Sequence, residues 1–246
     1  MPRIVTYNVH RCIGADSRLD VGRVAGVIAA LEPDIVALQE LDVGRARTGG
    51  VDQAHQIAQR LEMAFHFNAA MRVEEEQYGD AILTRYPERL ERAAPLPALR
   101  TRLRLETRGA LRVAVQIGEA SLRVINAHLS LVPREQRLQA AALAGPDWLG
   151  SEPPAATIVL GDFNATSPSI VYRTLAARLG DARRLAAQRR ASSTFPAAFP
   201  LLRIDHIFVS HDVRVERVEA PYTRATRAAS DHLPLVMDFT LETAPA

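Results

Sequence analysis

Short apolar segments of β-strand character recur along the whole chain, and this recurrence most restricts the folds it can adopt. Apolar runs of this length, separated by turn residues, predict strands that are buried in sheets. The predicted strands are Ile4–Val9, Ile35–Gln39, Ala64–Asn68, Ala81–Thr84, Leu111–Ile117, Leu122–Ala127, Thr157–Leu160, Ile204–Val209, Val213–Val218 and Leu235–Leu241.

Four other segments have the apolar spacing of three to four residues that is typical of amphipathic helices. Asp20 is predicted to cap the first helix, Pro133 to lie at the start of the third, and Ser169 to cap the fourth. Many strands with few helices favour an α/β fold in which two packed sheets have helical cover. The predicted helices are Val21–Leu31, Asp52–Leu61, Arg134–Leu143 and Ile170–Leu179.

The composition is that of an ordinary globular protein. The 246 residues contain no low-complexity linker and no convincing repeat, so we expect a single domain over residues 1–246. Cys12 is the only cysteine, which excludes an internal disulfide and a Cys-based zinc site. Because no apolar run is long enough to span a membrane and no signal-peptide pattern is present, we expect a cytoplasmic location.

The charge of the chain is nearly balanced. All 30 basic residues are arginines, and the net charge is only +2 at pH 7. This balance argues against a large nucleic-acid footprint, so nucleic acid stays open as a partner without being indicated by charge. One basic cluster is interpreted as a solvated face: Arg183, Arg184, Arg189 and Arg190. The sequence does not predict the oligomeric state.

Polar residues follow or end most of the predicted strands. If these strand ends gather at one rim, an Asn, a Glu, three Asp or Asn positions and two His converge in one pocket that is rich in oxygen atoms and free of thiolates. Such a set suits a hard cation, Mg²⁺ or Mn²⁺, better than a structural zinc ion. The polar residues are Asn8, Gln39, Glu40, Asn126, His128, Asp162, Asn164, Asp205, His206, Ser230, Asp231 and His232.

The segment Gly-Asp-Phe-Asn at residues 161–164 directly follows an apolar run. In an extended segment Asp162 and Asn164 point to the same side, and Phe163 points into the core. A carboxylate and an amide at a strand exit can hold a water molecule and a developing oxyanion. The alternative is an ordinary turn, in which Asp and Asn are common.

Taken together and in this order, the polar segments resemble those of the endonuclease/exonuclease/phosphatase family, the DNase I-like metal-dependent phosphoesterases. The resemblance runs from Ile4 to Val236, and "LQE", "GDFN" and "SDHLP" carry it most strongly. It implies a four-layered α/β sandwich of two mixed sheets packed face to face, with helices outside and the active site at one end.

The resemblance also implies a role for each matching residue. Glu40 would be the main metal ligand, with Asn8 and Asp231 near the same ion. Asp162 would orient or deprotonate the attacking water, and Asn164 would stabilise the phosphorane oxyanion. His232, oriented by Asp205, would contact the phosphate as a base or a stabilising charge. His128 would face the scissile phosphate.

Three further residues are candidates for contacts around this site. Asp80 stands where family members often have Asn, and we hypothesise that it pairs with His128 and raises its proton affinity. His10 follows Asn8 by two positions and is expected on the same side of the strand. Arg108, in "ETRGAL", is a candidate phosphate contact.

Several other features are interpreted as structural or as ordinary surface. Two Pro-containing segments, Ala94–Ala98 and Phe195–Pro200, are predicted to be surface loops near an opening. The acidic run Glu74–Glu76 is predicted to be a solvated loop. The histidines predicted to be structural are His55, His66, His206 and His211.

The predicted reaction is divalent-metal-dependent hydrolysis of a phosphoester, by attack of an activated water on phosphorus. The near-minimal length and the lack of an aromatic and basic stripe favour a phosphodiesterase acting on a small or lipid-derived phosphoester. A DNA or RNA endonuclease or exonuclease is the alternative. An inactive binding module of the same fold is remote, because the residues whose loss would favour it are all present.

Overall fold

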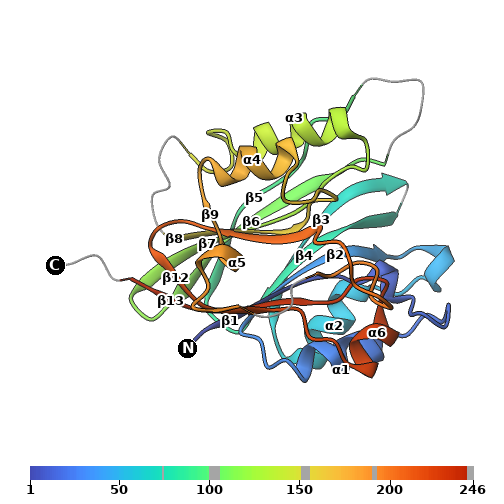
Figure 1. Ribbon diagram of the computed structural model, residues 1–246. Coiled ribbons are helices and arrows are strands. Elements are labelled where there is room, and N and C mark those ends of the chain that lie inside the picture. Colours follow the sequence, from blue (N-terminus) through green and yellow to red (C-terminus); the bar gives the residue numbers. More distant parts are fainter. Residues whose placement is uncertain (74, 100–105, 151–155, 190–192, 243–246) are drawn as a thin grey trace.

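Two β-sheets pack face to face, and helices cover the outer side of each sheet (Figure 1). The structure is a computed structural model and describes residues 1–73, 75–99, 106–150, 156–189 and 193–242. The arrangement is the predicted α/β sandwich of four layers. That the chain forms one domain stays a prediction.

Both sheets mix parallel and antiparallel neighbours. In the first, β1 is parallel to β2 and antiparallel to β13; in the second, β8 is parallel to β7 and antiparallel to β11. The first sheet has the order β10 (Gln188–Arg189), β12 (Val213–Glu219), β13 (Leu235–Leu241), β1 (Arg3–Asn8), β2 (Ile35–Val43), β4 (Glu76–Thr84), β3 (Ala64–Val73). The second has the order β5 (Glu88–Pro95), β6 (Gly109–Ile117), β7 (Ala120–His128), β8 (Ala156–Asp162), β11 (Asp205–Val209), β9 (Gly180–Asp181).

Helices α1, α2 and α6 lie against the first sheet, and α3 and α4 lie against the second (Figure 1). The predicted capping side chains are in place: Asp20 accepts from the N–H of Arg23, and Ser169 accepts from that of Tyr172. The helices are α1 (Val21–Ala29), α2 (Gln53–Leu61), α3 (Pro133–Leu143), α4 (Ile170–Ala176), α5 (Ala182–Leu185) and α6 (Arg224–Ala229), with 3-10 turns η1 (His10–Cys12) and η2 (Ala46–Thr48).

The strands are apolar on both faces because each sheet is covered on both sides. Ile4 and Leu160 point into the core between the sheets. Val5 packs under α1 and α2, and Val159 packs under α3 and α4. Successive residues of one strand therefore enter different apolar layers, which fixes the register of the strands.

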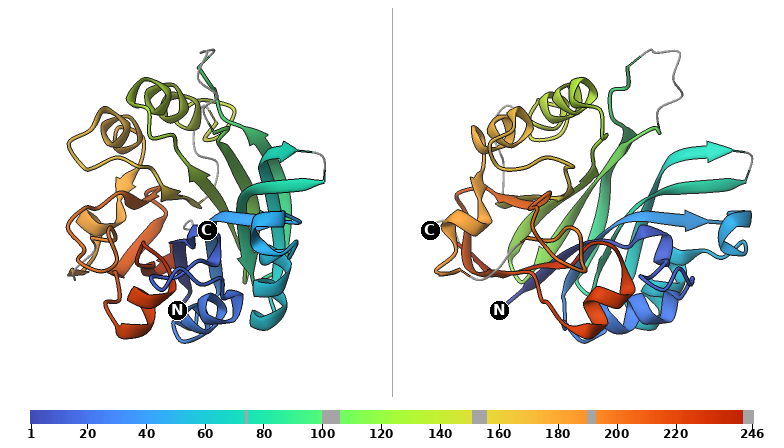
Figure 2. Two further views of the ribbon diagram at one scale, coloured as in Figure 1. Left: turned by 90° about the vertical axis from the view of Figure 1, so that its right-hand side faces the viewer. Right: turned by 45° about the vertical axis from the view of Figure 1, so that its right-hand side comes forward.

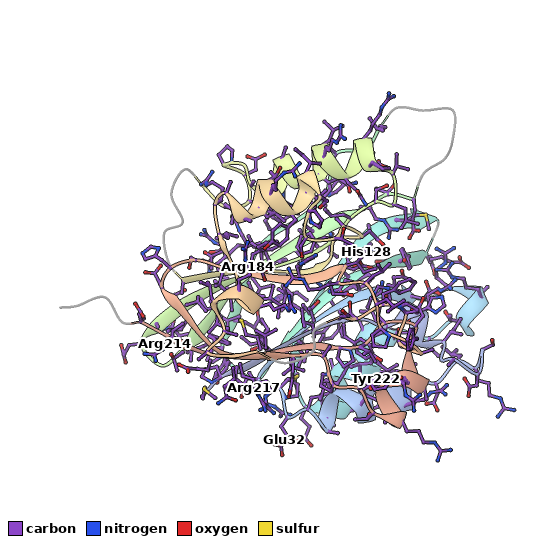
Figure 3. All side chains as sticks on the ribbon, in the orientation of Figure 1. Glu32, His128, Arg184, Arg214, Arg217 and Tyr222 are labelled. Atoms are coloured by element: carbon purple, nitrogen blue, oxygen red, sulfur yellow. The ribbon has the colours of Figure 1, made fainter. Side chains whose placement is uncertain are left out.

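All ten predicted strands and all four predicted helices are present, with ends moved by a few residues. Strand β5 was missed, and the prediction of a loop over Ala94–Ala98 is wrong for Ala94 and Pro95, which end this strand. Among the described residues, no helix has the length and apolarity needed to cross a membrane. The two sheets diverge toward one end of the molecule (Figure 2), and His128 lies toward that end (Figure 3).

Candidate functional site

Three of the predicted site residues share one rung of the second sheet. In β8, Asp162 lies opposite His128 of the parallel strand β7 and opposite Asp205 of the antiparallel strand β11. All three side chains are buried, with at most 2% of the residue exposed. Adjacent strands are about 4.8 Å apart, so strand pairing alone brings an imidazole and two carboxylates together.

Gly161 allows β8 to approach β7 closely just before this rung. Its φ is +141°, and a Cβ at this position would lie 1.9 Å from the carbonyl oxygen of Ala127. A side chain would push the two strands apart. The glycine before Asp162 is therefore required by backbone contact.

A turn brings the side chains of both Asp162 and Asn164 beside Nε2 of His128. The strand ends at Asp162, whose Oδ1 accepts from the backbone N–H of Asn164 at 2.9 Å, and Asn164 is left-handed with φ of +48°. The expected extended alternation is therefore wrong, although the side chains of Asp162 and Asn164 still lie on the same side, beside His128. Phe163 is buried at 1% exposure and packs edge-to-face on Phe208, as predicted.

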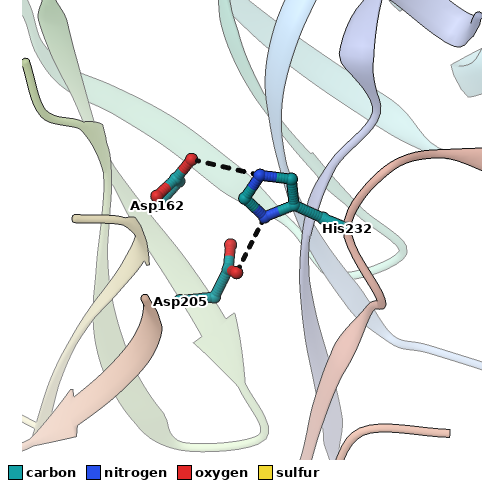
Figure 4. A group of neighbouring side chains, drawn as sticks. All are labelled: Asp162, Asp205 and His232. Atoms are coloured by element: carbon teal, nitrogen blue, oxygen red, sulfur yellow. Dashed lines mark hydrogen bonds and ion pairs between the residues drawn. The ribbon is translucent and has the colours of Figure 1, made fainter. Parts of the chain in front are cut away.

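Asp205 and His232 form a hydrogen-bonded pair (Figure 4). His232 Nδ1 lies 2.9 Å from Asp205 Oδ2, and its Nε2 points toward Asp162 Oδ2 at 3.7 Å. Thr194 donates its hydroxyl to the same Asp205 oxygen at 2.5 Å. Burial alone would lower the pKa of His232, but Asp205 and then Asp162 outweigh it and raise the pKa to about 10. The imidazole is thus held as a cation with Nε2–H facing the site.

Asp162 is a buried acid that lies beside another acid, Asp205. Burial and the neighbouring negative charge of Asp205 raise its pKa to about 7, against the opposing effects of His232 and of its hydrogen bonds. A carboxylate whose pKa lies near neutrality can accept a proton at physiological pH. This is the property needed in a group that activates water.

The first sheet contributes Asn8 and Glu40 from across the interface between the sheets. Asn8 Nδ2 donates to Glu40 Oε1 at 3.1 Å and to Asp162 Oδ2 at 3.0 Å. Glu40 has a φ of +62° within a register shift of β2 between Leu38 and Leu41. This bulge re-aims the carboxylate, as bulges near active sites often do.

The described residues offer two groups of possible metal ligands. Donor atoms of Asp162, Asp205 and His232 lie within 4.8 Å of one another. The predicted set is different: Glu40 and Asp231 line one pocket, and Asn8 contacts Glu40. Asp231 is more exposed, with 45% of its side chain accessible, and its Oδ1 lies 3.6 Å from His10 Nδ1.

Arg108 contacts the buried side of His128. Its Nη1 lies 2.9 Å from His128 Nδ1. Because arginine can only donate, Nδ1 must accept, and Nε2 carries the proton. Burial, Arg108 and His232 hold the pKa of His128 well below its usual range. His128 is therefore a neutral donor, with Nε2 at 3.5 Å from Asp162 Oδ2 and 3.3 Å from Asn164 Nδ2.

The hypothesis that Asp80 pairs with His128 and raises its proton affinity is wrong. Arg108 occupies the free ring nitrogen, and the pKa of His128 is lowered. Asp80 is buried in β4 with 2% exposure. Burial raises its pKa to about 8, while Arg108 and the backbone N–H of Glu40 oppose the rise. The carboxyl group of Asp80 therefore lies against the backbone N–H of Glu40.

The chain leaves β1 through a turn in which His10, Arg11 and Cys12 all have positive φ, between +45° and +58°. His10 donates its N–H to Asn8 Oδ1 at 3.0 Å, and Arg11 Nη2 lies 2.5 Å from His10 Nε2. This turn is one wall of a pocket of about 540 Å³. The pocket is lined by His10, Arg11, Glu40, Arg47, Met71, Tyr78, Glu106, Arg108, Leu131 and Asp231.

Sequence reasoning gave no role to several residues that support the site. Thr194 binds Asp205, and Gln39 donates to Asn126 Oδ1 at 2.8 Å across the two sheets. Asn126 in turn donates to the carbonyl oxygens of Leu38 and Ala81, both at 2.9 Å. For Gln39 and Asn126, the only indication in the sequence was a polar residue inside an apolar strand, and this does not predict which residue it contacts.

The remaining interpretations have mixed outcomes: the prediction of a solvated loop is wrong for Glu76, which begins β4, and His211, predicted to be structural, is exposed. His206 is buried and its Nε2 lies 2.7 Å from the carbonyl oxygen of Ala165, a core contact. The loop at Phe195–Pro200 reaches the site, because the ring of Phe195 packs at 4.9 Å from that of His232. Glu76 belongs to β4 and pairs with Arg45, whereas Glu74 lies outside the described residues, as does Arg190.

Comparison with known proteins agrees with this fold. The chain is 28% identical over 258 residues to the uncharacterized protein YbhP of Escherichia coli K12, covering 97% of this chain and 96% of YbhP. An endonuclease/exonuclease/phosphatase from Beutenbergia cavernae superposes with a TM-score of 0.79 at 24% identity, covering 99% of this chain and 72% of that one. A mannosyl-6-phosphatase from Bacteroides thetaiotaomicron superposes with a TM-score of 0.76 at 20% identity, covering 98% of this chain and 100% of that one.

These likenesses to solved structures support the fold. The family model of the endonuclease/exonuclease/phosphatase family matches residues 5–232, a span that includes Asn8, Glu40, the rung of the second sheet and His232. The chain belongs to the endonuclease/exonuclease/phosphatase family, whose members are phosphoesterases.

Proposed function

We propose that the protein is a divalent-metal-dependent hydrolase of small or lipid-derived phosphoesters, with phosphodiesters as the first substrates to test. One observation carries the proposal. Asp162 lies within hydrogen-bonding reach of Asn8 and beside both His128 and His232, so a base, two imidazole donors and an amide converge on one point.

The protein's own groups account for most of the reaction. Asp162 accepts a proton from the attacking water as the water oxygen bonds to phosphorus. The bond from phosphorus to the leaving oxygen breaks, and that oxygen takes up a proton from water. His232, held as a cation by Asp205, donates to a phosphoryl oxygen on which negative charge develops. The neutral Nε2–H of His128 and the amide of Asn164 donate to the remaining oxygens. Because these donors are fixed by strand pairing and buried hydrogen bonds, little reorganisation is needed during the reaction.

The residues present fit a hard cation. Glu40 and Asp162 converge with only an amide nitrogen between them, and Glu40 and Asp231 open into the same pocket. Glu40, Asp231 and Asn8 would hold Mg²⁺ or Mn²⁺, and Asn8 would have to turn its amide oxygen inward. When bound, the cation neutralises charge on the phosphate and polarises its oxygens.

The alternative metal group of Asp162, Asp205 and His232 is less suitable. A histidine that ligates a metal must be unprotonated at the ligating nitrogen. Asp205 holds Nδ1 of His232 at 2.9 Å, and Asp205 and Asp162 raise the pKa of His232, which favours the protonated imidazole in the metal-free protein. We therefore assign this group to proton transfer and charge stabilisation.

Metal dependence gives a direct test. Glu40→Gln should lower turnover about 10²- to 10³-fold, because one strong electrostatic element at the reacting centre is lost. Initial rates are measured with Mg²⁺ and with Mn²⁺ on bis-p-nitrophenyl phosphate, sphingomyelin, inositol phosphates, nucleotides, plasmid DNA and RNA. Circular dichroism checks that the fold is retained.

Glu119→Gln is the matched control, since Glu119 is exposed and lies outside the pocket. Its rate should equal that of the wild type. Full activity in EDTA, or an unchanged rate for Glu40→Gln, would contradict the metal assignment. Preferential cleavage of DNA or RNA over every small phosphoester would favour the nuclease alternative.

A further inference from the structure

The pocket that contains Glu40 and Asp231 is lined by three acidic side chains and three arginines. Two of the three arginines have clear protein partners. Arg47 forms a two-pronged ion pair with the buried carboxylate of Asp42 at 2.6 and 2.7 Å. Arg108 contacts His128 and, at 3.4 Å, Glu106.

Arg11 is different, because no carboxylate among the described residues forms an ion pair with it. Among the described residues, the one hydrogen bond of its side chain goes to His10 Nε2, and its Nε, like that of Arg108, is buried without a hydrogen-bond partner. Arg11 is only partly buried, so the rest of its guanidinium group is open to a ligand. The guanidinium group has the fork geometry that binds phosphate or carboxylate with two hydrogen bonds.

The backbone holds Arg11 in this position. His10, Arg11 and Cys12 all lie in the left-handed region, which side chains other than glycine rarely adopt in succession. The turn is fixed by the buried Gln53, which donates to the carbonyl oxygen of Arg11 at 2.7 Å, and by the N–H of Cys12, which donates to Val9 at 2.8 Å. Strained backbone that persists in this way is typical of functional sites.

His10 separates Arg11 from the reacting centre. One nitrogen of its ring faces Asp231 at 3.6 Å, and the other accepts from Arg11. An imidazole ring therefore lies between the guanidinium and the acid that we place at the metal. A group bound by Arg11 lies beyond the phosphate that is cleaved, and Arg47 faces the same pocket.

We propose that Arg11, with His10 and Arg47 beside it, forms a second anion subsite, and that the substrate is a small phosphoester with a further phosphate or carboxylate group. This inference rests on the proposed function, because it takes the centre around Glu40 and Asp162 as the place where the scissile phosphate binds.

The test measures binding without turnover. Bisphosphonates with one to four carbons between phosphorus atoms, the ω-phosphonocarboxylates of the same lengths, and the matching alkylphosphonates cannot be hydrolysed as esters. Their dissociation constants are measured by titration calorimetry with the Mg²⁺-loaded protein. At one chain length the doubly anionic probe should bind about 10- to 100-fold more tightly than the alkylphosphonate, the range for a charged hydrogen bond.

Variants locate the effect. Arg11→Gln should bring this ratio close to one, Arg11→Lys should retain part of it, and Arg60→Gln, at an exposed position of α2 outside the pocket, should keep it whole. Melting temperatures confirm folding. If the phosphonocarboxylate binds as tightly as the bisphosphonate, the second group is a carboxylate. If only the bisphosphonate binds more tightly than the alkylphosphonate, the second group is a phosphate.

Two results would overturn the proposal: a ratio near one in the wild type at every length, or a ratio unchanged in Arg11→Gln, with either no loss or an equal loss of affinity for both probe classes. An equal loss would place Arg11 on the scissile phosphate. A wild-type protein that shows the ratio yet hydrolyses no phosphoester contradicts the proposed function and supports the subsite.

Discussion

At the scale of single residues, the site consists of groups whose neighbours give each a different protonation state. His232 is kept charged by Asp205, and His128 is kept neutral by burial and Arg108. Two histidines of the same chemistry thus become one cationic and one neutral donor. The pKa of Asp162 is raised by burial and by Asp205 to about 7, which suits a base.

Substitutions at Asn164 test whether its side chain contributes to turnover and its backbone conformation to stability. Asn164→Gly and Asn164→Ala both remove the amide that donates to Leu129 at 3.0 Å and lies beside His128. Turnover should fall equally in the two variants. Stability should differ, since φ is +48° and alanine is strained there while glycine is not. Urea titration should find the alanine variant less stable by about 1 kcal/mol.

The outcome that would contradict this account is an alanine variant as stable as the glycine variant. In that case the turn relaxes without cost, and its left-handed conformation places no constraint on the sequence. Equal stability with unequal turnover would show instead that the position acts through backbone placement, since both variants lack the amide.

Residue types and their order were predictable from sequence, but their partners were not. Asp162, Asn164, Asp205 and His232 come together as the resemblance implies. The contact between Arg108 and His128 was missed because it joins a loop to a strand end twenty positions away, and no local pattern encodes that approach. The mistaken pairing of Asp80 arose in the same way.

At the scale of elements, β7, β8 and β11 decide the geometry of the site, and the loops decide its opening. Apolar strands were easy to predict because both faces are buried. Strand β5 was difficult to predict, because "ERLERAAP" shows no alternation of apolar and polar residues and the strand lies at the edge of its sheet. Edge strands commonly carry charge, which hides them from a search for apolar runs.

Gly161→Ala tests the close contact between β7 and β8. The new Cβ would meet the carbonyl oxygen of Ala127 at 1.9 Å, and φ of +141° is unfavourable for alanine. Denaturant titration should show a loss of about 3 kcal/mol or more, the upper range for overpacking, combined with backbone strain. Since the rung of His128 and Asp162 follows directly, turnover should fall as well.

Gly26→Ala is the matched control for this substitution. Gly26 lies inside α1, and its Cβ would meet no atom within 4 Å. Alanine should therefore stabilise the protein by roughly 0.5–1 kcal/mol through helix propensity. If both variants behave alike, close approach of the strands does not explain the glycine before Asp162.

At the scale of the whole molecule, the folded protein holds protons that the unfolded chain releases. The pKa values of Asp80, Asp162 and His232 are all raised on folding, to about 8, 7 and 10. A group with a raised pKa contributes stability that is complete below its unfolded pKa and is lost as the pH rises through its folded pKa. The lowered pKa values of His128 and His206 oppose this loss near pH 6.5 but add no change above pH 7, so the metal-free protein should lose stability from pH 7 to pH 9.

Asp80→Asn isolates one part of this effect. At pH 9 the buried carboxylate of the wild type is charged, whereas the amide is neutral at any pH. The stability gained by the variant should be larger at pH 9 than at pH 6 by roughly 2–3 kcal/mol, given a shift from 3.8 to about 8. Thermal or urea unfolding in EDTA at the two pH values measures the difference.

Asp147→Asn provides the comparison, because 75% of the Asp147 side chain is exposed and its replacement should give nearly the same change at both pH values. If the gain in unfolding free energy of the Asp80→Asn variant does not grow with pH, the pKa of Asp80 is not raised by burial.

The rung that joins His128, Asp162 and Asp205 also indicates how proteins with this architecture can diverge. Its spacing comes from backbone pairing, so it survives almost any exchange of surface turns. The turn at His10–Cys12 and the pocket side chains Arg47, Met71 and Leu131 do not set this spacing, so mutation can change them without removing the catalytic residues. Inherited chemistry and acquired selectivity thus occupy separate parts of the chain, and a new substrate can arise by replacing one turn.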